Sequence, residues 1–359
     1  MSNHQKLDEI LLLAVDRHAS DIHMTAGKPV IYRIDGKLTD KDDHIMEPEE
    51  IADIVVPLYA DNPRLVEIME ETGEIDFAYS LQGKGRFRVN VFRQRGTIGM
   101  VMRLLPFKIP APRELGLPAS VQDLITRKRG LVLVTGATGS GKSTTLASLI
   151  NVINKTYARH IITLEDPIEY LHQHDKSIVN QREIGDDTKD YAGALRAALR
   201  EDPDVILVGE MRDNETIQTA ITAAETGHLV FSTLHTNGAA DTINRVIDVF
   251  PPHQQQQIRV QLASVIECVI SQQLLPIQNA QGRVAAFEVM LGSSAIRSLV
   301  REGKAYQIPS TMQTSKKLGM ITMDDSLYNL YIGGLITAED CCNYAQDVPG
   351  MEKRISYHS

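Results

Sequence analysis

The stretch LVLVTGATGSGKSTT, residues 131–145, decides the fold of this chain. An apolar run leads into a glycine-rich turn that matches the pattern G-x-x-x-x-G-K-[ST] through Gly136, Gly141, Lys142 and Ser143. Between a predicted strand and a predicted helix, this pattern is typical of the phosphate-binding loop of P-loop nucleotide hydrolases. The glycines let backbone N–H groups wrap around a phosphate, and the dipole of the following helix favours its negative charge. A glycine-rich turn without a ligand is the alternative.

The loop predicts ATP and Mg²⁺ as ligands. Lys142 can reach the β- and γ-phosphates, and the hydroxyl of Ser143 is in the position that holds Mg²⁺ in P-loop enzymes. The residues predicted to bind the nucleotide are Gly136, Ala137, Thr138, Gly139, Ser140, Gly141, Lys142, Ser143 and Thr144.

Strands and helices alternate along the chain from residue 131 onward. Apolar strands are predicted at 131–135, 160–164, 204–208 and 229–233. Helices are predicted at 142–154, 188–200, 213–226 and 239–248. Continuous apolar strands that alternate with helices indicate an α/β fold with a parallel sheet covered on both faces. From about residue 253 onward we expect mostly helix, with a hairpin across 274–290.

Acidic residues follow two of these strands, where the ligands of an open parallel sheet bind. Glu165 and Asp166 follow 160–164, and Glu210 follows 204–208. Gly209 stands where the second motif of P-loop enzymes, Walker B, usually places a magnesium-holding Asp. Carboxylates beside a P-loop can hold magnesium or polarise water, so we predict catalytic roles for the three acids. Each alone could instead be a turn or capping residue.

Two histidines, His228 and His235, flank the strand at 229–233. Their spacing does not match that of a zinc-binding helix, and no cysteine lies near them in the sequence. They are either structural histidines or, at the strand end, sensors of the γ-phosphate.

The chain is predicted to have two domains joined by a linker. Residues 1–105 carry helical and hairpin patterns typical of a small α+β domain. Four prolines between Pro106 and Pro118 predict a semi-rigid linker over 106–118. Residues 119–359 then form the P-loop domain with its C-terminal helical region.

The N-terminal domain contains an arginine-rich stretch without acids, from Phe77 to Arg113. Its arginines include Arg86, Arg88, Arg93, Arg95 and Arg103. Alternation along GRFRVNVF puts Arg86 and Arg88 on the face opposite the apolar residues. This face is either a solvated strand surface or a phosphate-binding surface that supplies arginine fingers to the nucleotide.

The overall charge restricts the partners. The 359 residues carry a net charge of −9, with a pI of about 5.7, which argues against a general nucleic-acid-binding protein. No apolar run approaches the roughly 18 residues needed to span a bilayer. We therefore expect a cytoplasmic protein without direct membrane insertion, which reaches a membrane only through a partner.

Over nearly its whole length, the chain resembles the secretion ATPases of type IV pilus and type II secretion systems. Five segments are similar to family motifs: ASDIHMTAGKPVIYRIDGKL to the N-terminal PAS-like domain, GATGSGKSTT to Walker A, ITLEDPIEY to the Asp box, LRAALREDPDVILVGEMRD to an atypical Walker B, and TGHLVFSTLHTN to the His box. The stretch AIRSLVREGK, 295–304, resembles a motif of retraction-type members, with mild departures at Ser298 and Val300.

The resemblance implies a RecA-like ATPase core with a PAS-like domain, assembled into a homohexamer. Its ATP hydrolysis would turn an inner-membrane pilus platform protein and retract the pilus in twitching motility. It makes Glu210 the catalytic glutamate, assigns Glu165 and Asp166 to magnesium and water, and makes His228 and His235 the His-box residues. Arg88 and Arg95 become the expected phosphate contacts.

Other functions remain open at this point. Assembly-type relatives usually carry a further N-terminal domain and a four-cysteine metal motif that the sequence does not show, so we expect retraction rather than pilus assembly or secretion. A retraction accessory ATPase is the nearest competitor. A RecA-like ATPase that acts on nucleic acid and a nucleotide-gated module without turnover are the more distant ones.

Overall fold

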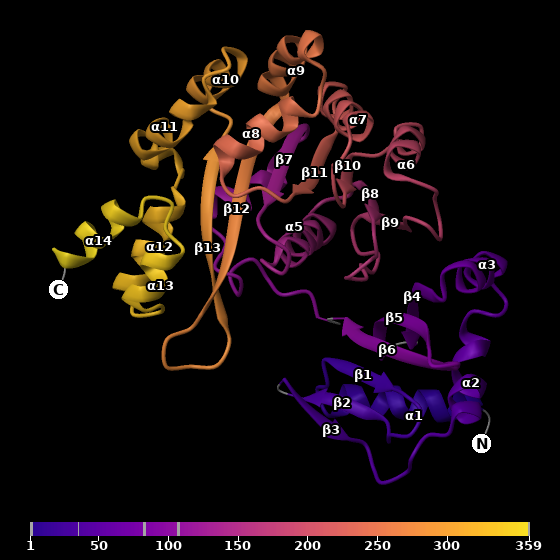
Figure 1. Ribbon diagram of the computed structural model, residues 1–359. Helices are drawn as coiled ribbons and strands as arrows, with labels where there is room; N and C mark the ends of the chain where they lie inside the picture. Colours follow the sequence, from indigo (N-terminus) through magenta and orange to yellow (C-terminus); the bar gives the residue numbers. More distant parts are fainter. Residues whose placement is uncertain (1–2, 35, 82–83, 106–107, 358–359) are drawn as a thin grey trace. The chain divides into compact units, whose positions relative to one another are not determined.

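The computed structural model describes residues 3–34, 36–81, 84–105 and 108–357, and the chain divides into two compact units (Figure 1). The first unit comprises Met1–Lys108 with Pro167–Leu171, and the second comprises Ile109–Asp166 with His172–Ser359. The boundaries expected at residues 105 and 118 stay predictions.

The first unit is an antiparallel sheet with helices packed on it. Its strands run in the order β3-β2-β1-β6-β5-β4. The elements are α1 (Asn3–Asp16), β1 (Asp21–Met24), β2 (Ile31–Ile34), β3 (Lys37–Asp40), α2 (Pro48–Val55), the 3₁₀ helix η1 (Val56–Leu58), α3 (Pro63–Thr72), β4 (Glu74–Leu81), β5 (Gly85–Gln94) and β6 (Thr97–Leu105). The predicted α+β pattern of this segment is confirmed, and Asp35, between β2 and β3, lies outside the described residues.

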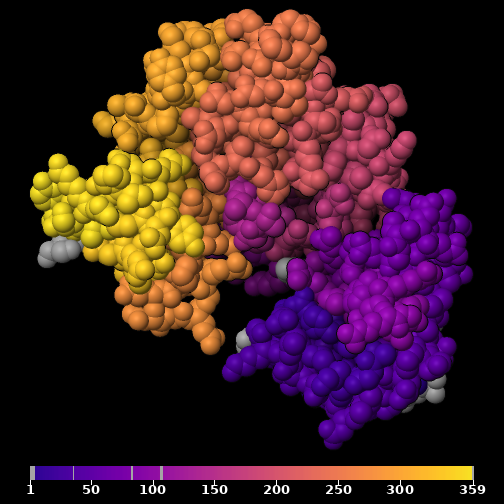
Figure 2. Space-filling model, in the orientation of Figure 1, coloured from indigo at the N-terminus to yellow at the C-terminus, as the bar shows by residue number. Residues whose placement is uncertain are grey.

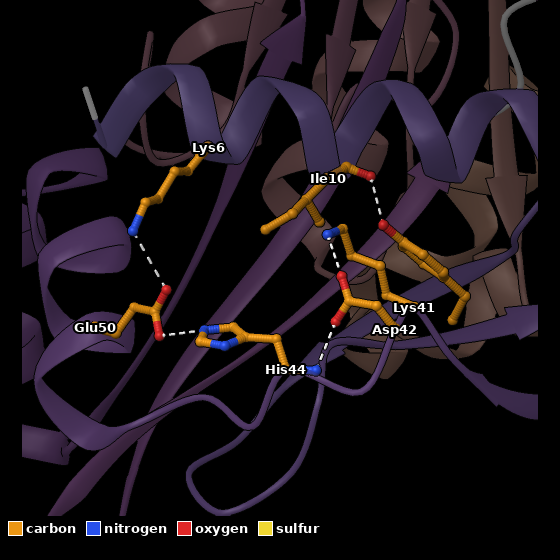
Figure 3. Close-up of polar contacts among 7 residues, drawn as sticks. Lys6, Ile10, Lys41, Asp42, His44 and Glu50 are labelled. Carbon is orange, nitrogen blue, oxygen red and sulfur yellow. Dashed lines mark hydrogen bonds and ion pairs between the residues drawn. The ribbon is translucent and has the colours of Figure 1, made fainter. Parts of the chain in front are cut away.

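Polar contacts join α1 and α2 to the segment after β3 (Figure 3). The carboxylate of Glu50 accepts one hydrogen bond from Lys6 Nζ at 3.3 Å, and its other oxygen lies 2.8 Å from His44 Nε2. The buried hydroxyl of Tyr32 donates to the carbonyl of Ile10 at 2.9 Å. Exposed ion pairs add little stability, so the buried apolar residues between α1, α2 and the sheet hold this unit together.

The second unit is built on a seven-stranded sheet in the order β13-β12-β7-β11-β10-β8-β9. All neighbouring strands are parallel except the β12–β13 hairpin. The strands are β7 (Gly130–Thr135), β8 (His160–Glu165), β9 (Ile178–Glu183), β10 (Val205–Val208), β11 (Leu229–Leu234), β12 (Ile266–Pro276) and β13 (Arg283–Leu291). This confirms the predicted α/β core with a parallel sheet.

Helices cover both faces of this sheet. The elements are α4 (Ala119–Gln122), η2 (Asp123–Thr126), α5 (Lys142–Thr156), α6 (Tyr191–Ala198), α7 (Asn214–Glu225), α8 (Ala239–Asp248), α9 (Pro252–Val265), α10 (Ser294–Arg301), η3 (Ala305–Gln307), α11 (Ile308–Thr314), η4 (Lys316–Leu318), α12 (Met323–Ile332), α13 (Ala338–Asn343) and α14 (Val348–Ser356). Side chains of α5 share a buried core with one face, and those of α6 to α9 with the other. Helices α12 to α14 form a further small core with β12 and β13, and in Figure 2 the yellow atoms of the C-terminal region lie against orange atoms.

Two strands of the second unit differ from the sequence prediction. Strand β9 was not predicted, and β12 begins at Ile266, inside a segment expected to be mostly helical. The predicted hairpin turn is correct, but the strand before it is longer than predicted. The additional residues of β12 pair in parallel with β7 along Ile266–Ser271. A short apolar run does not distinguish a buried strand from a buried helix, which explains the error.

Candidate nucleotide site

The P-loop connects β7 to α5 in a backbone conformation that requires glycine. Gly136 has φ 142°, and a Cβ there would lie 2.3 Å from the carbonyl oxygen of Gln272. Gly141 has φ 91°, and its Cβ would lie 2.7 Å from the side-chain Nε2 of Gln272. Both positions therefore exclude any larger residue. Strand β12 supplies Gln272, so it forms the wall against which the loop is folded.

Lys142 fills the centre of the loop. Its side chain is buried, and Nζ donates to the carbonyl oxygens of Gly136 at 2.8 Å and Ala137 at 3.0 Å. The same Nζ lies 3.5 Å from Nδ1 of His235. A phosphate oxygen is a stronger partner for an ammonium group than a neutral carbonyl. The loop thus holds a buried positive charge where a phosphate would be bound.

The carboxyl ends of three neighbouring strands meet beside this lysine. β10 pairs in parallel with β8 on one side and with β11 on the other, so Glu165, Glu210 and His235 come to one edge of the sheet. Glu210 Oε1 lies 3.5 Å from His235 Nε2, and Glu210 Oε2 lies 2.7 Å from Arg212 Nη2. The imidazole of His235 therefore lies between Lys142 and Glu210.

The chemistry of Lys142 assigns the tautomer of this histidine. An ammonium group can only donate, so Nδ1 of His235 is the acceptor, and Nε2 carries the proton that faces Glu210. A γ-phosphate that attracts Lys142 would change one partner of the imidazole while Glu210 remains the other. The arrangement can therefore transmit the presence of a phosphate to the carboxylate.

The charge state of Glu210 follows from its surroundings. Partial burial alone raises its pKa, but the hydrogen bond and charge of Arg212, together with the charge of Lys142, outweigh burial and lower the pKa. Glu210 is therefore ionised at neutral pH, as a group that polarises water or accepts its proton must be.

A tyrosine that the sequence analysis missed lies among the acids. The hydroxyl of Tyr191, from the first turn of α6, reaches the space in front of Gly209. Burial raises the pKa of Tyr191, and the nearby negative charges of Asp166, Glu210 and Glu165 raise it further. Tyrosine at a helix start belongs to no motif, so only the packing of α6 on the sheet reveals it.

Glu165 and Asp166 lie at the end of β8 and just beyond it. The carboxylate of Glu165 accepts hydrogen bonds from Thr163 Oγ1 at 2.7 Å and Gln181 Nε2 at 3.0 Å, while Asp166 is exposed. The hydroxyl of Ser143, the second residue of α5, is half-buried. Hydroxyl and carboxylate oxygens are the donors that Mg²⁺ prefers, so these residues fit the predicted metal.

One predicted site residue of the second unit, His228, does not lie beside Lys142. His228 precedes β11, at the opposite end of the strand from His235, and its Nδ1 lies 2.9 Å from the carbonyl oxygen of Ala223. A strand rises about 3.3 Å per residue, so the seven residue steps from His228 to His235 along β11 separate the two histidines by about 23 Å. The two histidines flank β11 as the sequence indicated, and a catalytic role for His228 stays a prediction.

Arg88 and Arg95 belong to the first unit. Arg88 lies on β5 with its Nε 3.8 Å from Asp76 Oδ1, and the exposed Arg95 occupies the β5–β6 turn with φ 47°. The acid-free stretch is thus less basic in three dimensions than in sequence, because Asp76 on β4 faces it. Phosphate contact by either arginine stays a prediction.

Comparison with known proteins places this geometry in a family. Residues 3–324 match the family model described as type II/IV secretion system protein. The chain is 47% identical over 334 residues to the type IV pilus retraction ATPase PilT of Pseudomonas aeruginosa, covering 93% of this chain and 96% of that protein. It is 48% identical over 306 residues to a twitching motility protein of Neisseria gonorrhoeae, covering 85% of this chain and 81% of that protein.

A solved structure has the same fold. The crystal structure of the pilus retraction motor PilT with bound ADP superposes with a TM-score of 0.88 and 50% identity, covering 96% of this chain and 98% of that one. Within the described residues of the present chain, no helix combines the length and the apolarity that a membrane span requires.

Proposed function

Because this chain belongs to the type II/IV secretion system protein family and is an ATP-hydrolysing enzyme, we propose that it is the motor that retracts type IV pili. The array from Lys142 through His235 and Glu210 to Arg212 carries the proposal. It joins the P-loop charge to a carboxylate that is ionised at neutral pH, as an enzyme that hydrolyses ATP requires.

Each residue of the array has a role in this proposal. The P-loop residues from Gly136 to Thr144 bind the phosphates, and Lys142 leaves its loop carbonyls for the β- and γ-phosphate oxygens. Glu210 orients the attacking water and accepts its proton. His235 detects the γ-phosphate through Lys142. Mg²⁺, held by Ser143 with help from Glu165 and Asp166, would neutralise the developing phosphate charge.

The proposal extends to the assembly. The protein acts as a homohexamer at the cytoplasmic side of the inner membrane, where it turns the pilus platform protein without inserting into the bilayer and without a nucleic-acid partner. Arg88 or Arg95 serves as an arginine finger for the nucleotide. His228 positions its strand through the Ala223 carbonyl rather than contacting phosphate.

The enzymatic part is tested by Glu210→Gln in the purified full-length protein. Loss of the carboxylate should reduce phosphate release at least about a hundredfold, the usual scale of general-base catalysis, while ATP binding persists. Glu215→Gln is the matched control, because Glu215 is an exposed acid on α7 that pairs with Arg196. A wild-type hexamer that binds ATP and never releases phosphate would refute the proposal.

The direction of the motor is tested in cells. Deletion of the gene should leave surface pili present or more abundant but unable to retract, with twitching motility lost. Loss of surface pili would instead assign the protein to pilus assembly.

The arginine finger is tested by mixing two inactive variants, Arg88→Ala and Lys142→Ala, in one hexamer. Partial recovery of ATPase activity is expected if Arg88 acts on a nucleotide bound by another subunit. The same experiment with Arg95→Ala decides which arginine acts. Recovery with neither variant would exclude both as fingers between subunits.

A further inference from the structure

Strand β9 brings a side chain beside Glu165 that belongs to no recognised motif. β8 and β9 pair in parallel with Thr163 opposite Gln181, above the buried pair Ile161 and Val179. Residues paired in parallel strands, and residues two apart on one strand, point to the same face. Thr163, Glu165 and Gln181 therefore lie on one face of the sheet, at the edge where the nucleotide site lies.

The amide of Gln181 has a defined orientation. Its Oε1 accepts a hydrogen bond from the backbone N–H of His172 at 2.7 Å, and its Nε2 donates to Glu165 Oε1 at 3.0 Å. Reversing the amide would place an NH₂ group against the N–H and an oxygen against the carboxylate, so both contacts would become repulsive. The backbone of His172 thereby fixes which end of Gln181 faces Glu165.

Thr163 acts on the same carboxylate oxygen. Its Oγ1 donates to Glu165 Oε1 at 2.7 Å, so two donors from two strands converge on one atom. Two hydrogen bonds to one carboxylate oxygen restrict the rotation of the side chain and the plane of the carboxylate. The groups involved come from the sheet, whose backbone positions are rigid, so the orientation of Glu165 is set before any ligand binds.

We propose that Gln181 is a positioning residue that holds the carboxylate of Glu165 in the orientation that ATP hydrolysis needs. The inference rests on the proposed function of the site. Partners of this kind typically change activity or metal affinity by about 10- to 100-fold when they are removed.

The first test is Gln181→Met, which keeps the length of the side chain and removes both hydrogen bonds. We expect kcat to fall about 10- to 100-fold while the affinity for a fluorescent ADP analogue changes less than about twofold. Asn180→Ala is the control, since Asn180 lies on the same strand, points to the other face and has its side chain beside His160 rather than Glu165. Its kcat should match that of the wild type.

The second test is Gln181→Glu, whose result a purely structural role would not produce. The new carboxylate can still accept from the His172 N–H, but its other oxygen would face Glu165 Oε1. Two carboxylates at this distance share a proton, so the acid limb of the kcat–pH profile should move to higher pH. The double variant Glu165→Gln with Gln181→Glu should not show that shift, because only one carboxylate remains.

The outcomes separate this inference from the proposed function. If the wild type does not hydrolyse ATP, the function itself is wrong. If the wild type is active and Glu165→Gln is impaired but Gln181→Met behaves like Asn180→Ala, only the positioning role is wrong. Equal losses of ADP binding and kcat in Gln181→Met, or an unshifted acid limb in Gln181→Glu, would also overturn it.

Discussion

The hydroxyl oxygen of Tyr191 lies 2.8 Å from the point that a Cβ atom at position 209 would occupy. The carbonyl oxygen of Leu164 lies 3.0 Å from the same point and accepts a hydrogen bond from the Gly209 N–H at 2.7 Å. No side chain fits at position 209 without moving one of these groups. The missing Asp of the Walker B strand is therefore a consequence of how α6 and β8 pack around β10.

We expect Gly209→Asp to damage the protein rather than restore a common magnesium ligand. Overpacking of this kind costs about 1–3 kcal/mol, so the melting temperature should fall and ATP hydrolysis should decrease. Tyr191→Phe removes the nearest atom and should recover part of the lost stability in the double variant. Gly333→Ala, at an exposed helix end, is the control and should leave the melting temperature nearly unchanged. A fully stable Gly209→Asp protein would contradict the packing argument.

Arg212→Ala should move the acid limb of the ATPase pH profile to higher pH. Burial raises the pKa of Glu210, and Arg212 supplies the hydrogen bond and charge that most strongly oppose it. Without Arg212 the pKa rises, so Glu210 becomes protonated at a higher pH and the water loses its base. The lowered pKa of Glu210 also stabilises the folded state at pH values above the pKa of the unfolded state. This stabilisation is lost as the pH falls through the pKa of the folded state.

The measurement is kcat between about pH 4 and pH 8, a range that spans the ordinary glutamate pKa. Arg196→Ala serves as the control, because it removes an exposed arginine that pairs with Glu215 rather than with Glu210. Identical acid limbs for wild type and Arg212→Ala would show that Arg212 does not set the protonation of Glu210.

Lys142→Ala should weaken binding of ADP and ATP. Hydrogen bonds from a charged group contribute about 1.5–3 kcal/mol each, so the loss of one phosphate contact should raise Kd by at least about tenfold. Lys155→Ala, at the exposed far end of the same helix, is the control and should bind like the wild type. Titration with a fluorescent nucleotide measures both, and equal affinities would remove Lys142 from the phosphate site.

The sequence was sufficient for the parts of the site that lie next to one another along the chain. The P-loop pattern, the apolar strands and the acids after them predicted the edge where Lys142, Glu165, Glu210 and His235 meet. The sequence also placed His228 and His235 on either side of β11, but it does not distinguish a structural from a catalytic role for His228. Gln181, Tyr191 and Gln272 could not be predicted, since β9, α6 and β12 bring them to the site by long-range pairing and packing.

Glu288 on β13 offers a test of a different part of the second unit. Its buried carboxylate accepts hydrogen bonds from the N–H of Ala239 at 2.6 Å and the N–H of Met323 at 3.2 Å, the first residues of α8 and α12. A cavity of about 360 Å³ lies beside it and is lined also by Asp241 and Gln346. One carboxylate thus caps two helices, one of which follows directly after the segment that contains His235.

The pKa of Glu288 determines how this double cap depends on pH. Burial raises the pKa of Glu288, and the two backbone N–H groups only partly oppose burial. The folded protein therefore binds a proton more tightly at this site than the unfolded chain does. Its contribution to the free energy of unfolding must then decrease as the pH rises from the unfolded-state pKa through the folded-state pKa.

Glu288→Gln should remove this pH dependence, because an amide does not titrate, while it keeps one acceptor for a helix N–H. Glu288→Ala should destabilise the second unit at every pH, since two buried N–H groups lose their acceptor at about 1–3 kcal/mol each. Urea unfolding followed by circular dichroism at a series of pH values measures both effects. If wild type and Glu288→Gln lose stability in parallel as the pH rises, Glu288 does not couple protonation to the capping of α8 and α12.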